Sequence, residues 1–158
     1  MTGRSLALVA AALLAAATLT MWRVNRTSEK LVTAEAVIAL GRGLYDENCA
    51  SCHGANLQGQ PDWKIPLENG RYPAPPHDAT GHTWHHDDAM LTDYIRRGGQ
   101  AVLDGMGVSM TSGMPAFGEI LTDGDIAAIL AFIKSTWPDR IRAIQADLAA
   151  SNTKERNR

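Results

Sequence analysis

The chain has 158 residues, which is enough for one domain with extensions at its ends. Its 15 Lys and Arg residues nearly balance its 17 Asp and Glu residues, so the charge pattern shows no basic stripe of the kind that binds nucleic acid. The sequence contains no internal repeat, which excludes solenoid and propeller architectures.

The N-terminus carries an uncharged apolar run from Leu6 to Trp22, preceded by Arg4. Two interpretations of residues 1–22 stay open. The small residues at 15–17 suit a signal peptidase, which favours a cleaved secretory signal. The run also reaches the lower length limit of a membrane-spanning helix, which favours an uncleaved anchor. We expect the anchor, with the signal peptide as the alternative.

A polar tether is predicted for residues 23–33, followed by a helix with Thr33 as its N-cap. The buried stripe of this helix is predicted to contain Val37, Ile38, Gly41, Leu44 and Tyr45, which recur at helical spacing. A glycine inside a helix costs about 1 kcal/mol relative to alanine. Gly41 therefore predicts that another helix approaches closely at this point.

The predicted helix ends in Cys49-Ala50-Ser51-Cys52-His53, a C-x-x-C-H motif typical of covalent c-type haem attachment. Each thiol can add to one vinyl group of the porphyrin, and His53 can then bind the iron. A thioredoxin-like redox pair would require a βαβ context, which is absent. A structural zinc site needs four ligands, and the chain has only these two cysteines. The motif therefore predicts one covalent haem.

Residues 54–86 are rich in Gly, Pro, Asn and Asp and show no sustained periodicity. Such a loop is long for a compact domain, but it can fold over a large apolar ligand instead of over itself. Candidates to hydrogen-bond or screen the haem propionates in this segment are Trp63, Arg71, Tyr72 and Trp84. Ordinary loop packing is the alternative for each of them.

A short helix is predicted after Asp87 or Asp88, one of which caps it, and Gly98-Gly99 ends it. Its apolar residues are Met90, Leu91, Tyr94 and Ile95. Residues 100–119 are then expected to form a loop on the distal side of the haem.

That loop contains Ser112-Gly113-Met114-Pro115-Ala116-Phe117-Gly118. Gly113 lets the backbone approach the macrocycle, and Pro115 stiffens the chain. Met114 is therefore predicted to be the second axial ligand of the iron, with Met110 as its rival.

Thr122 and Asp125 resemble a capping box at the start of the next helix. The buried face of this helix is predicted to comprise Ile126, Ile129, Leu130, Ile133 and Trp137, and to cross the first helix near Gly41. Pro138 ends the helix and opens another, with Ile141, Ile144 and Leu148 on one side. Residues 151–158 are polar and are expected to fray.

The motifs at Cys49, Cys52, His53 and Met114 resemble those of class I c-type cytochromes, and the likeness covers roughly residues 34–138. It implies an all-α fold, a small cytochrome c-like fold of three to five helices wrapped around one covalent haem c. The N-terminal apolar helix would precede this domain, and a C-terminal helical extension at 139–158 would follow it. In similar cytochromes a proline carbonyl accepts the proximal imidazole N–H, and Pro61 is expected to supply it.

A His/Met ligand pair favours Fe(II), raises the reduction potential and fills both axial positions of the iron. The sequence therefore predicts an electron carrier between respiratory complexes or periplasmic oxidoreductases, and no enzyme with a small-molecule substrate. Its partners would be redox proteins, and the membrane if the N-terminal helix is uncleaved. The resemblance implies a location on the periplasmic side of the bacterial inner membrane.

Two alternatives come from other residue clusters. Copper handling or sensing is suggested by His82, His85 and His86, together with Met106, Met110 and Met114 at every fourth position. The simpler interpretation is that the histidines flank a helix start and that the methionines pack against the porphyrin. A peroxidase-like or ligand-sensing protein would require an iron that Met114 leaves open.

Overall fold

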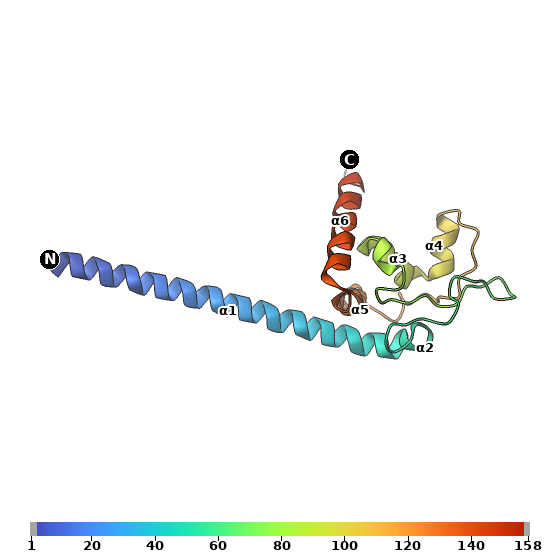
Figure 1. The fold of residues 1–158 in the computed structure, drawn as a ribbon, viewed down its shortest axis with the longest axis horizontal. Coiled ribbons are helices and arrows are strands. Elements are labelled where there is room, and N and C mark those ends of the chain that lie inside the picture. Colours follow the sequence, from blue (N-terminus) through green and yellow to red (C-terminus); the bar gives the residue numbers. More distant parts are fainter. Residues whose placement is uncertain (1–2, 157–158) are drawn as a thin grey trace. The chain divides into compact units, whose positions relative to one another are not determined.

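The computed structural model describes the backbone of residues 3–156 and the side chains of residues 13–28 and 33–154. The chain divides into two units, residues 1–36 and residues 37–158. Its elements are α1 (Gly3–Asn48), α2 (Ala50–His53), the 3₁₀ turn η1 (Thr83–His85), α3 (Asp88–Arg97), α4 (Gly99–Gly105), α5 (Asp123–Ser135) and α6 (Asp139–Arg156) (Figure 1). Within the described range the only extended pairing is a single bridge between Arg71 and Thr111, so the all-α prediction is confirmed.

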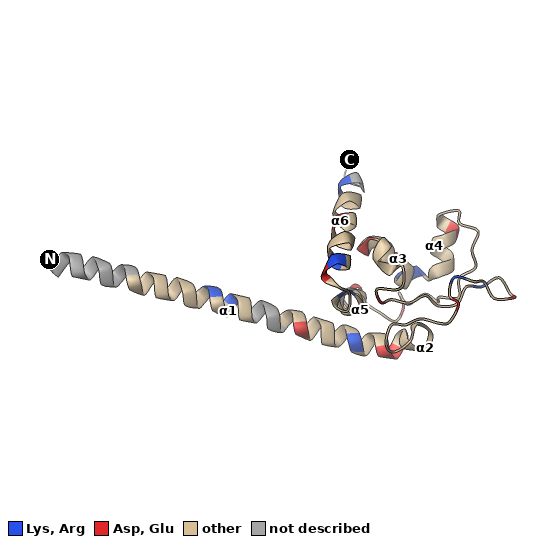
Figure 2. Ribbon diagram, viewed as in Figure 1, with Lys and Arg blue, Asp and Glu red and all other residues tan. Residues whose placement is uncertain are grey.

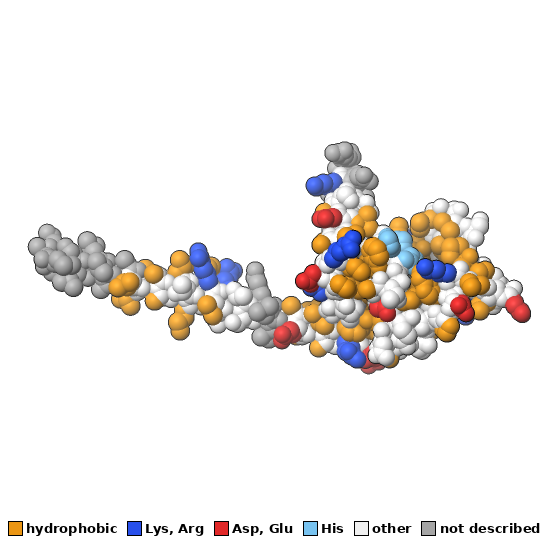
Figure 3. Space-filling view, viewed as in Figure 1, with side chains coloured by type: hydrophobic (Ala, Val, Ile, Leu, Met, Phe, Trp, Pro, Cys, Tyr) orange, Lys and Arg blue, Asp and Glu red, His pale blue; other side chains and the backbone are white. Residues whose placement is uncertain are grey.

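The first unit is part of α1, and its described apolar side chains are uncovered. They are Leu13, Leu14, Leu19, Met21, Trp22 and Val24. Figure 3 shows orange, hydrophobic atoms at the surface of the described part of this helix. Among the described residues no helix has the length and apolar character needed to span a membrane. The predicted span at 1–22 includes residues 1–12, whose side chains lie outside the described part.

The helix start predicted at Thr33 is wrong, because α1 has no break there and residues 23–33 are part of the same helix. The cause is local. Residues 23–40 contain no Gly or Pro, and they include Leu, Ala, Glu and Lys, which favour helix. Nothing in this stretch therefore stops the helix.

The second unit is organised around a close crossing of α1 and α5 at Gly41. A Cβ atom built on Gly41 would overlap the carbonyl oxygen of Ala128, so only glycine fits. One turn further on, the Tyr45 and Phe132 rings lie 5.5 Å apart between their centroids. The predicted crossing near Gly41 is confirmed. One residue of the stripe that was predicted to be buried on α1 is exposed: the side chain of Val37 is 39% exposed.

The core is built on α5. Four of the five residues predicted for its buried face lie in the helix and are buried: Ile126, Ile129, Leu130 and Ile133. The fifth, Trp137, is buried just beyond the end of the helix. The predicted capping box is present, with Thr122 Oγ1 accepting from Asp125 N–H and the Asp125 carboxylate accepting from Thr122 N–H. The α3 helix packs against both α5 and α4.

The α3 helix begins and ends as the sequence predicted. Asp87 is the cap, because its Oδ1 accepts from the backbone N–H of Met90 at 2.8 Å. Gly98 ends the helix with a φ of 81°. The loop predicted from residue 100 is partly wrong, however, because the chain enters α4 directly after Gly98. Val102 and Leu103 bury their side chains there, and this burial stabilises a turn of helix that the sequence alone did not indicate.

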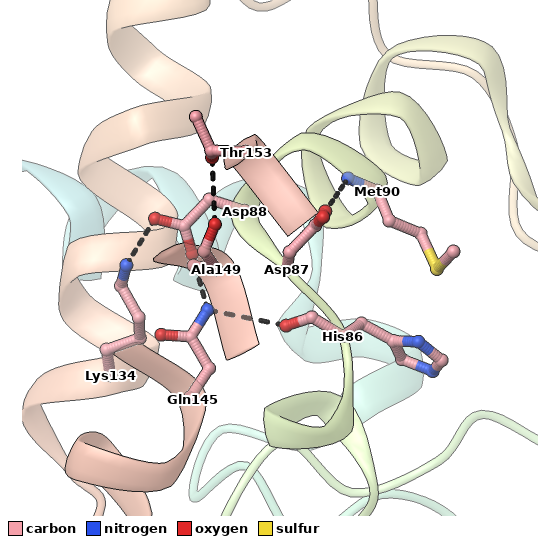
Figure 4. Close-up of polar contacts among 8 residues, drawn as sticks. All are labelled: His86, Asp87, Asp88, Met90, Lys134, Gln145, Ala149 and Thr153. Atoms are coloured by element: carbon pink, nitrogen blue, oxygen red, sulfur yellow. Dashed lines mark hydrogen bonds and ion pairs between the residues drawn. The ribbon is translucent and has the colours of Figure 1, made fainter. Parts of the chain in front are cut away.

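The α6 helix contacts η1 and the start of α3 through polar side chains (Figure 4). Gln145 is 3% exposed, and its amide nitrogen donates to Asp88 Oδ1 at 2.7 Å and to the carbonyl of His86 at 3.3 Å. Lys134 Nζ on α5 donates to the other oxygen of Asp88 at 2.7 Å. The buried face of α6 therefore contains Gln145, not Ile144, whose side chain is 42% exposed.

Residues 151–156 are helical, which differs from the predicted fraying. Asn152 Nδ2 donates to Asp87 Oδ2 at 3.0 Å, so the last turns of α6 are held against α3. Basic and acidic residues are interspersed along the ribbon in Figure 2, which agrees with the balanced charge of the sequence.

We predict that Gly41→Ala lowers the free energy of unfolding by at least about 2 kcal/mol, because the added methyl group forces α1 away from Ala128. Urea unfolding of the haem-loaded protein, followed by circular dichroism, measures this. The matched control is Gly43→Ala on the same helix, where an added Cβ meets nothing within 4 Å. It should leave stability unchanged or raise it by up to about 1 kcal/mol. Equal effects of the two substitutions would contradict the close crossing.

Candidate haem site

The C-x-x-C-H peptide follows directly from the crossing, because α1 ends at Asn48 and α2 carries the motif to His53. Cys49 and Cys52 are both free thiols. Cys49 is half-buried, and burial is the main cause that raises the pKa of its thiol to about 11, with a smaller contribution from Cys52. Cys52 is exposed. The two sulfur atoms are thus available to form bonds to a porphyrin.

His53 is buried, and its ring is fixed by one hydrogen bond. Its Nδ1 lies 2.8 Å from the carbonyl oxygen of Pro75. A carbonyl can only accept, so the proton is on Nδ1 and the lone pair is on Nε2. Burial lowers the pKa of the His53 imidazole, while the bond to Pro75 acts in the opposite direction. The neutral ring with a bare Nε2 is the form that binds a metal.

The acceptor predicted for this bond, Pro61, is wrong. Pro61 is exposed, and the chain makes an excursion between it and its return at Pro75, which is 22 residues after His53. Gly59 N–H donates to the His53 carbonyl at 2.8 Å and closes the turn before Pro61, and Gln60 N–H donates to the Ala74 carbonyl at 2.9 Å and closes the excursion itself. The loop therefore brings Pro75, and not the nearer proline, beside the ring.

Residues 75–77, which we call the proximal strap, have three consecutive carbonyls that each accept one side-chain donor. The Pro75 carbonyl accepts from His53 Nδ1–H at 2.8 Å, and the Pro76 carbonyl accepts from Thr83 Oγ1–H at 3.4 Å. The His77 carbonyl accepts from the indole N–H of Trp137 at 2.8 Å. The strap thus connects His53 to the end of the α5 segment. Sequence reasoning placed Trp137 in the core but missed this role.

The imidazole of His77 stacks on that of His53, with ring centroids 4.0 Å apart and an angle of 24° between the ring planes. His77 Nδ1 also lies 2.9 Å from Thr83 Oγ1. Burial, and then the neighbouring His53 and His82, lower the pKa of His77 well below its usual range. A neutral aromatic ring therefore supports the face of the predicted iron ligand.

The distal loop lies along the C-terminal end of α3. Gly99 N–H donates to the Met114 carbonyl at 3.0 Å, and Phe117 N–H donates to the Ile95 carbonyl at 2.9 Å. A Cβ atom on Gly98 would approach the Met114 carbonyl oxygen to 3.1 Å and the backbone of residues 115–116 more closely still. Met114 itself is half-buried and packs against the hydrophobic core. Met110, its predicted rival, has a side chain that is 40% exposed.

The candidates for propionate contacts have different surroundings. Arg71 is exposed and lies across Gly113, where a Cβ atom would come within 2.6 Å of its Nε atom. Tyr72 is half-buried, and its N–H donates to the Thr111 carbonyl at 3.2 Å. Trp63 stacks on His82 with a centroid separation of 5.3 Å.

Trp84 carries the one buried side-chain nitrogen or oxygen atom, among the described residues, that has no hydrogen-bond partner. This atom is the indole Nε1, and its ring stacks on His85 at 3.6 Å. A buried N–H without an acceptor is costly unless a ligand supplies one. Together with the two thiols and the bare Nε2 of His53, this orphaned donor fits a haem whose propionate accepts from Trp84.

The histidine cluster has no metal-binding arrangement. His82 and His86 approach each other at 5.3 Å between ring centroids, and His85 instead faces Trp84. Across the described residues, no group of three or more His, Cys, Asp or Glu side chains is placed to hold a metal ion. Met106, like Met110, is exposed. No contact in this cluster favours the copper alternative.

A family model described as cytochrome c matches residues 38–137. The CcoP subunit of the cbb3-type cytochrome c oxidase of Azospirillum brasilense is 32% identical over 104 residues, which are 66% of this chain and 30% of that protein. The cytochrome c subunit of the cytochrome bc1 complex of Mycobacterium tuberculosis is 53% identical over 30 residues, which are 19% of this chain and 11% of that protein. The chain thus spans 30% or less of the length of these curated relatives. No solved structure matches the chain at a significant level.

We predict that Trp84→Phe lowers the reduction potential of the haem-loaded protein, because a propionate that loses a hydrogen bond keeps more negative charge near the iron and so favours Fe(III). Potentiometric titration measures the change. Trp63→Phe is the matched control, since its ring can still stack on His82. A lower potential in the Trp63 variant alone would contradict the assignment.

Proposed function

This chain belongs to the cytochrome c family, and we propose that it is an electron-transfer protein that carries one covalent haem c and has no enzymatic activity of its own. The single observation that carries the proposal is the geometry of His53. Its proton is held by the Pro75 carbonyl, and its Nε2 is left for a metal, one residue after a pair of free thiols.

Each residue of the site has a defined task in this proposal. Cys49 and Cys52 hold the cofactor through thioether bonds, which prevent its loss outside the cytoplasm. His53 and Met114 would hold the iron through an imidazole nitrogen and a thioether sulfur. When bound, the haem supplies the iron that gains and loses the electron. The protein contributes the ligands, excludes water and keeps the His53 ring oriented through the proximal strap.

The ligand pair explains why the proposal is electron transfer and not catalysis on a substrate. A thioether is a soft, neutral ligand, so it stabilises Fe(II) relative to Fe(III). A buried site opposes the extra charge of Fe(III) and raises the potential further. Met114 would occupy the coordination position that oxygen or peroxide needs, which disfavours the peroxidase-like alternative.

The partners we propose are redox proteins of a respiratory chain. Two relatives are named as subunits of respiratory assemblies, a cbb3-type cytochrome c oxidase and a cytochrome bc1 complex. This chain covers only part of those proteins, so it is proposed as a carrier or as a subunit that exchanges single electrons with such complexes. The location proposed is the periplasmic side of the bacterial inner membrane.

We predict that Met114→Ala removes the charge-transfer absorption band of a Met–iron bond, lets the reduced protein bind carbon monoxide, and lowers the reduction potential. Optical spectroscopy and potentiometry of the haem-loaded variant measure these changes. Met110→Ala is the matched control, because it removes the same side chain from an exposed position four residues earlier. It should resemble the wild type in all three measurements.

The ligand assignment fails if Met114→Ala keeps the charge-transfer band. If Met110→Ala loses the band instead, the rival ligand is the correct one. If neither haem absorption nor covalently bound porphyrin is found in the matured protein, the proposed function is wrong as a whole.

Anchoring through residues 1–22 is tested by redox-difference spectra of separated membrane and soluble fractions from cells that express the full chain. We expect the haem absorption in the membrane fraction, because the apolar side chains of the first unit are uncovered. Leu14→Arg, which puts a charge into the run, should move it to the soluble fraction. Soluble haem with a shortened mass in the unmutated protein would instead support signal cleavage.

A further inference from the structure

Gln100, in the first turn of α4, holds the distal loop with both ends of its carboxamide. Its Oε1 accepts from the backbone N–H of Ser112 at 2.9 Å. Its Nε2 donates to the Met110 carbonyl at 3.3 Å and to Asp104 Oδ1 at 2.7 Å. The residue is not a ligand, and neither the sequence motifs nor the axial pair require it.

Asp104 fixes which way the amide of Gln100 points. A carboxylate accepts and does not donate, so the NH₂ end must face Asp104 and the oxygen must face Ser112 N–H. Both acceptors, Asp104 Oδ1 and the Met110 carbonyl, face the NH₂ group of Gln100, and the one donor, Ser112 N–H, faces its oxygen. The carboxamide therefore has one favoured orientation.

Ser112, which Gln100 binds, is in turn hydrogen-bonded to the backbone of Met114. Ser112 Oγ accepts from Met114 N–H at 3.2 Å, and Gly99 N–H donates to the Met114 carbonyl at 3.0 Å. A Cβ atom on Gly99 would overlap Ser112 Oγ, so α4 and the loop touch at this point. The start of α4 thus holds the backbone of Met114 at both its N–H and its carbonyl, the first of these through Ser112 and Gln100.

The opposite side of the loop is held by a different segment. Arg71 pairs with Thr111 in the isolated bridge, and Tyr72 N–H donates to the Thr111 carbonyl at 3.2 Å. The loop residues just before Met114 are therefore fixed from two sides. Within this arrangement Gln100 holds the main chain of Met110, whose side chain is 40% exposed, while Met114 is half-buried against the core.

We propose that Gln100 is a positioning residue that keeps Met114, and not Met110, in place as the axial thioether. The inference rests on the proposed function, because it takes Met114 to be the iron ligand. Loss of the Gln100 contacts frees Ser112 and Met110, so the loop opens more often and the thioether leaves its place for a larger fraction of the time. A competing ligand then binds more readily.

The test is a titration of the oxidised, haem-loaded protein with imidazole, followed by loss of the Met–iron charge-transfer band. Imidazole binds only when the thioether has left, so its apparent affinity reports how often the loop opens. Gln100→Leu keeps a side chain of similar size and removes all three hydrogen bonds. We expect its apparent Kd for imidazole to fall by about tenfold, the factor that corresponds to the loss of one or two net hydrogen bonds.

A rescue variant tests whether the hydrogen bonds of Gln100, and not the packing of its side chain, keep Met114 in place. Gln100→Glu alone places two carboxylates together and should behave like Gln100→Leu. Adding Asp104→Asn restores the contact between residues 100 and 104 with donor and acceptor exchanged, and the glutamate can still accept from Ser112 N–H. The bond to the Met110 carbonyl stays lost, because a carboxylate has no hydrogen to donate. The double variant should recover part of the wild-type Kd, because two of the three hydrogen bonds are restored. If it stays at the value of the single variant, the hydrogen bonds of Gln100 do not position Met114.

The matched control for global stability is Gln145→Leu, the same substitution on α6, which removes the hydrogen bonds of a buried glutamine to His86 and Asp88 and should also destabilise the fold. It should leave the imidazole Kd unchanged. An unchanged Kd in Gln100→Leu overturns the inference, and so does an equal shift in Gln145→Leu.

Met114→Ala distinguishes this inference from the proposed function on which it rests. If Met114→Ala retains the band, the ligand assignment itself fails. If it loses the band while Gln100→Leu binds imidazole like the wild type, the ligand assignment stands and only the role of Gln100 is rejected.

Discussion

The structure depends on one steric constraint, the close contact between α1 and α5 at Gly41. Because no side chain separates the helices there, Tyr45 and Phe132 meet one turn later and the buried face of α5 closes over α1. The same crossing sets both ends of the site. It directs α1 into the peptide that carries Cys49, Cys52 and His53, and it places Trp137 beside the segment that holds the His53 ring.

The two sides of the site are held in different ways. On the proximal side, three carbonyls in a row are each bonded to a side chain, so the orientation of His53 is coupled to α5 through rigid, proline-containing backbone. On the distal side, Met114 lies in a loop whose backbone is held by the start of α4 and by the bridge at Arg71. Such an arrangement suits an electron carrier, since a site that changes little between oxidation states has little to reorganise when the electron moves.

The orphaned indole N–H of Trp84 is the observation that supports the proposed contact between the fold and a haem. This donor is buried and has no acceptor within the protein, and native proteins rarely leave such a group unpaired. The sequence named Trp84 only as one of four candidates. Its burial and its missing partner distinguish it from Trp63, which stacks on His82, and from Arg71, which lies across Gly113.

The sequence by itself determined what is local or periodic: the C-x-x-C-H motif, a helix cap at Asp87 or Asp88, the capping box at Thr122, the buried face of α5 and the close helix approach at Gly41. These follow from spacing and side-chain chemistry within a few residues. Only the tertiary structure decided that Pro75 and not Pro61 accepts from His53, that Gln145 and not Ile144 faces the core, and that Gln100 holds the distal loop. Each of these depends on how a loop without periodicity returns to a distant element, and that path is set by long-range packing that no short stretch of sequence encodes.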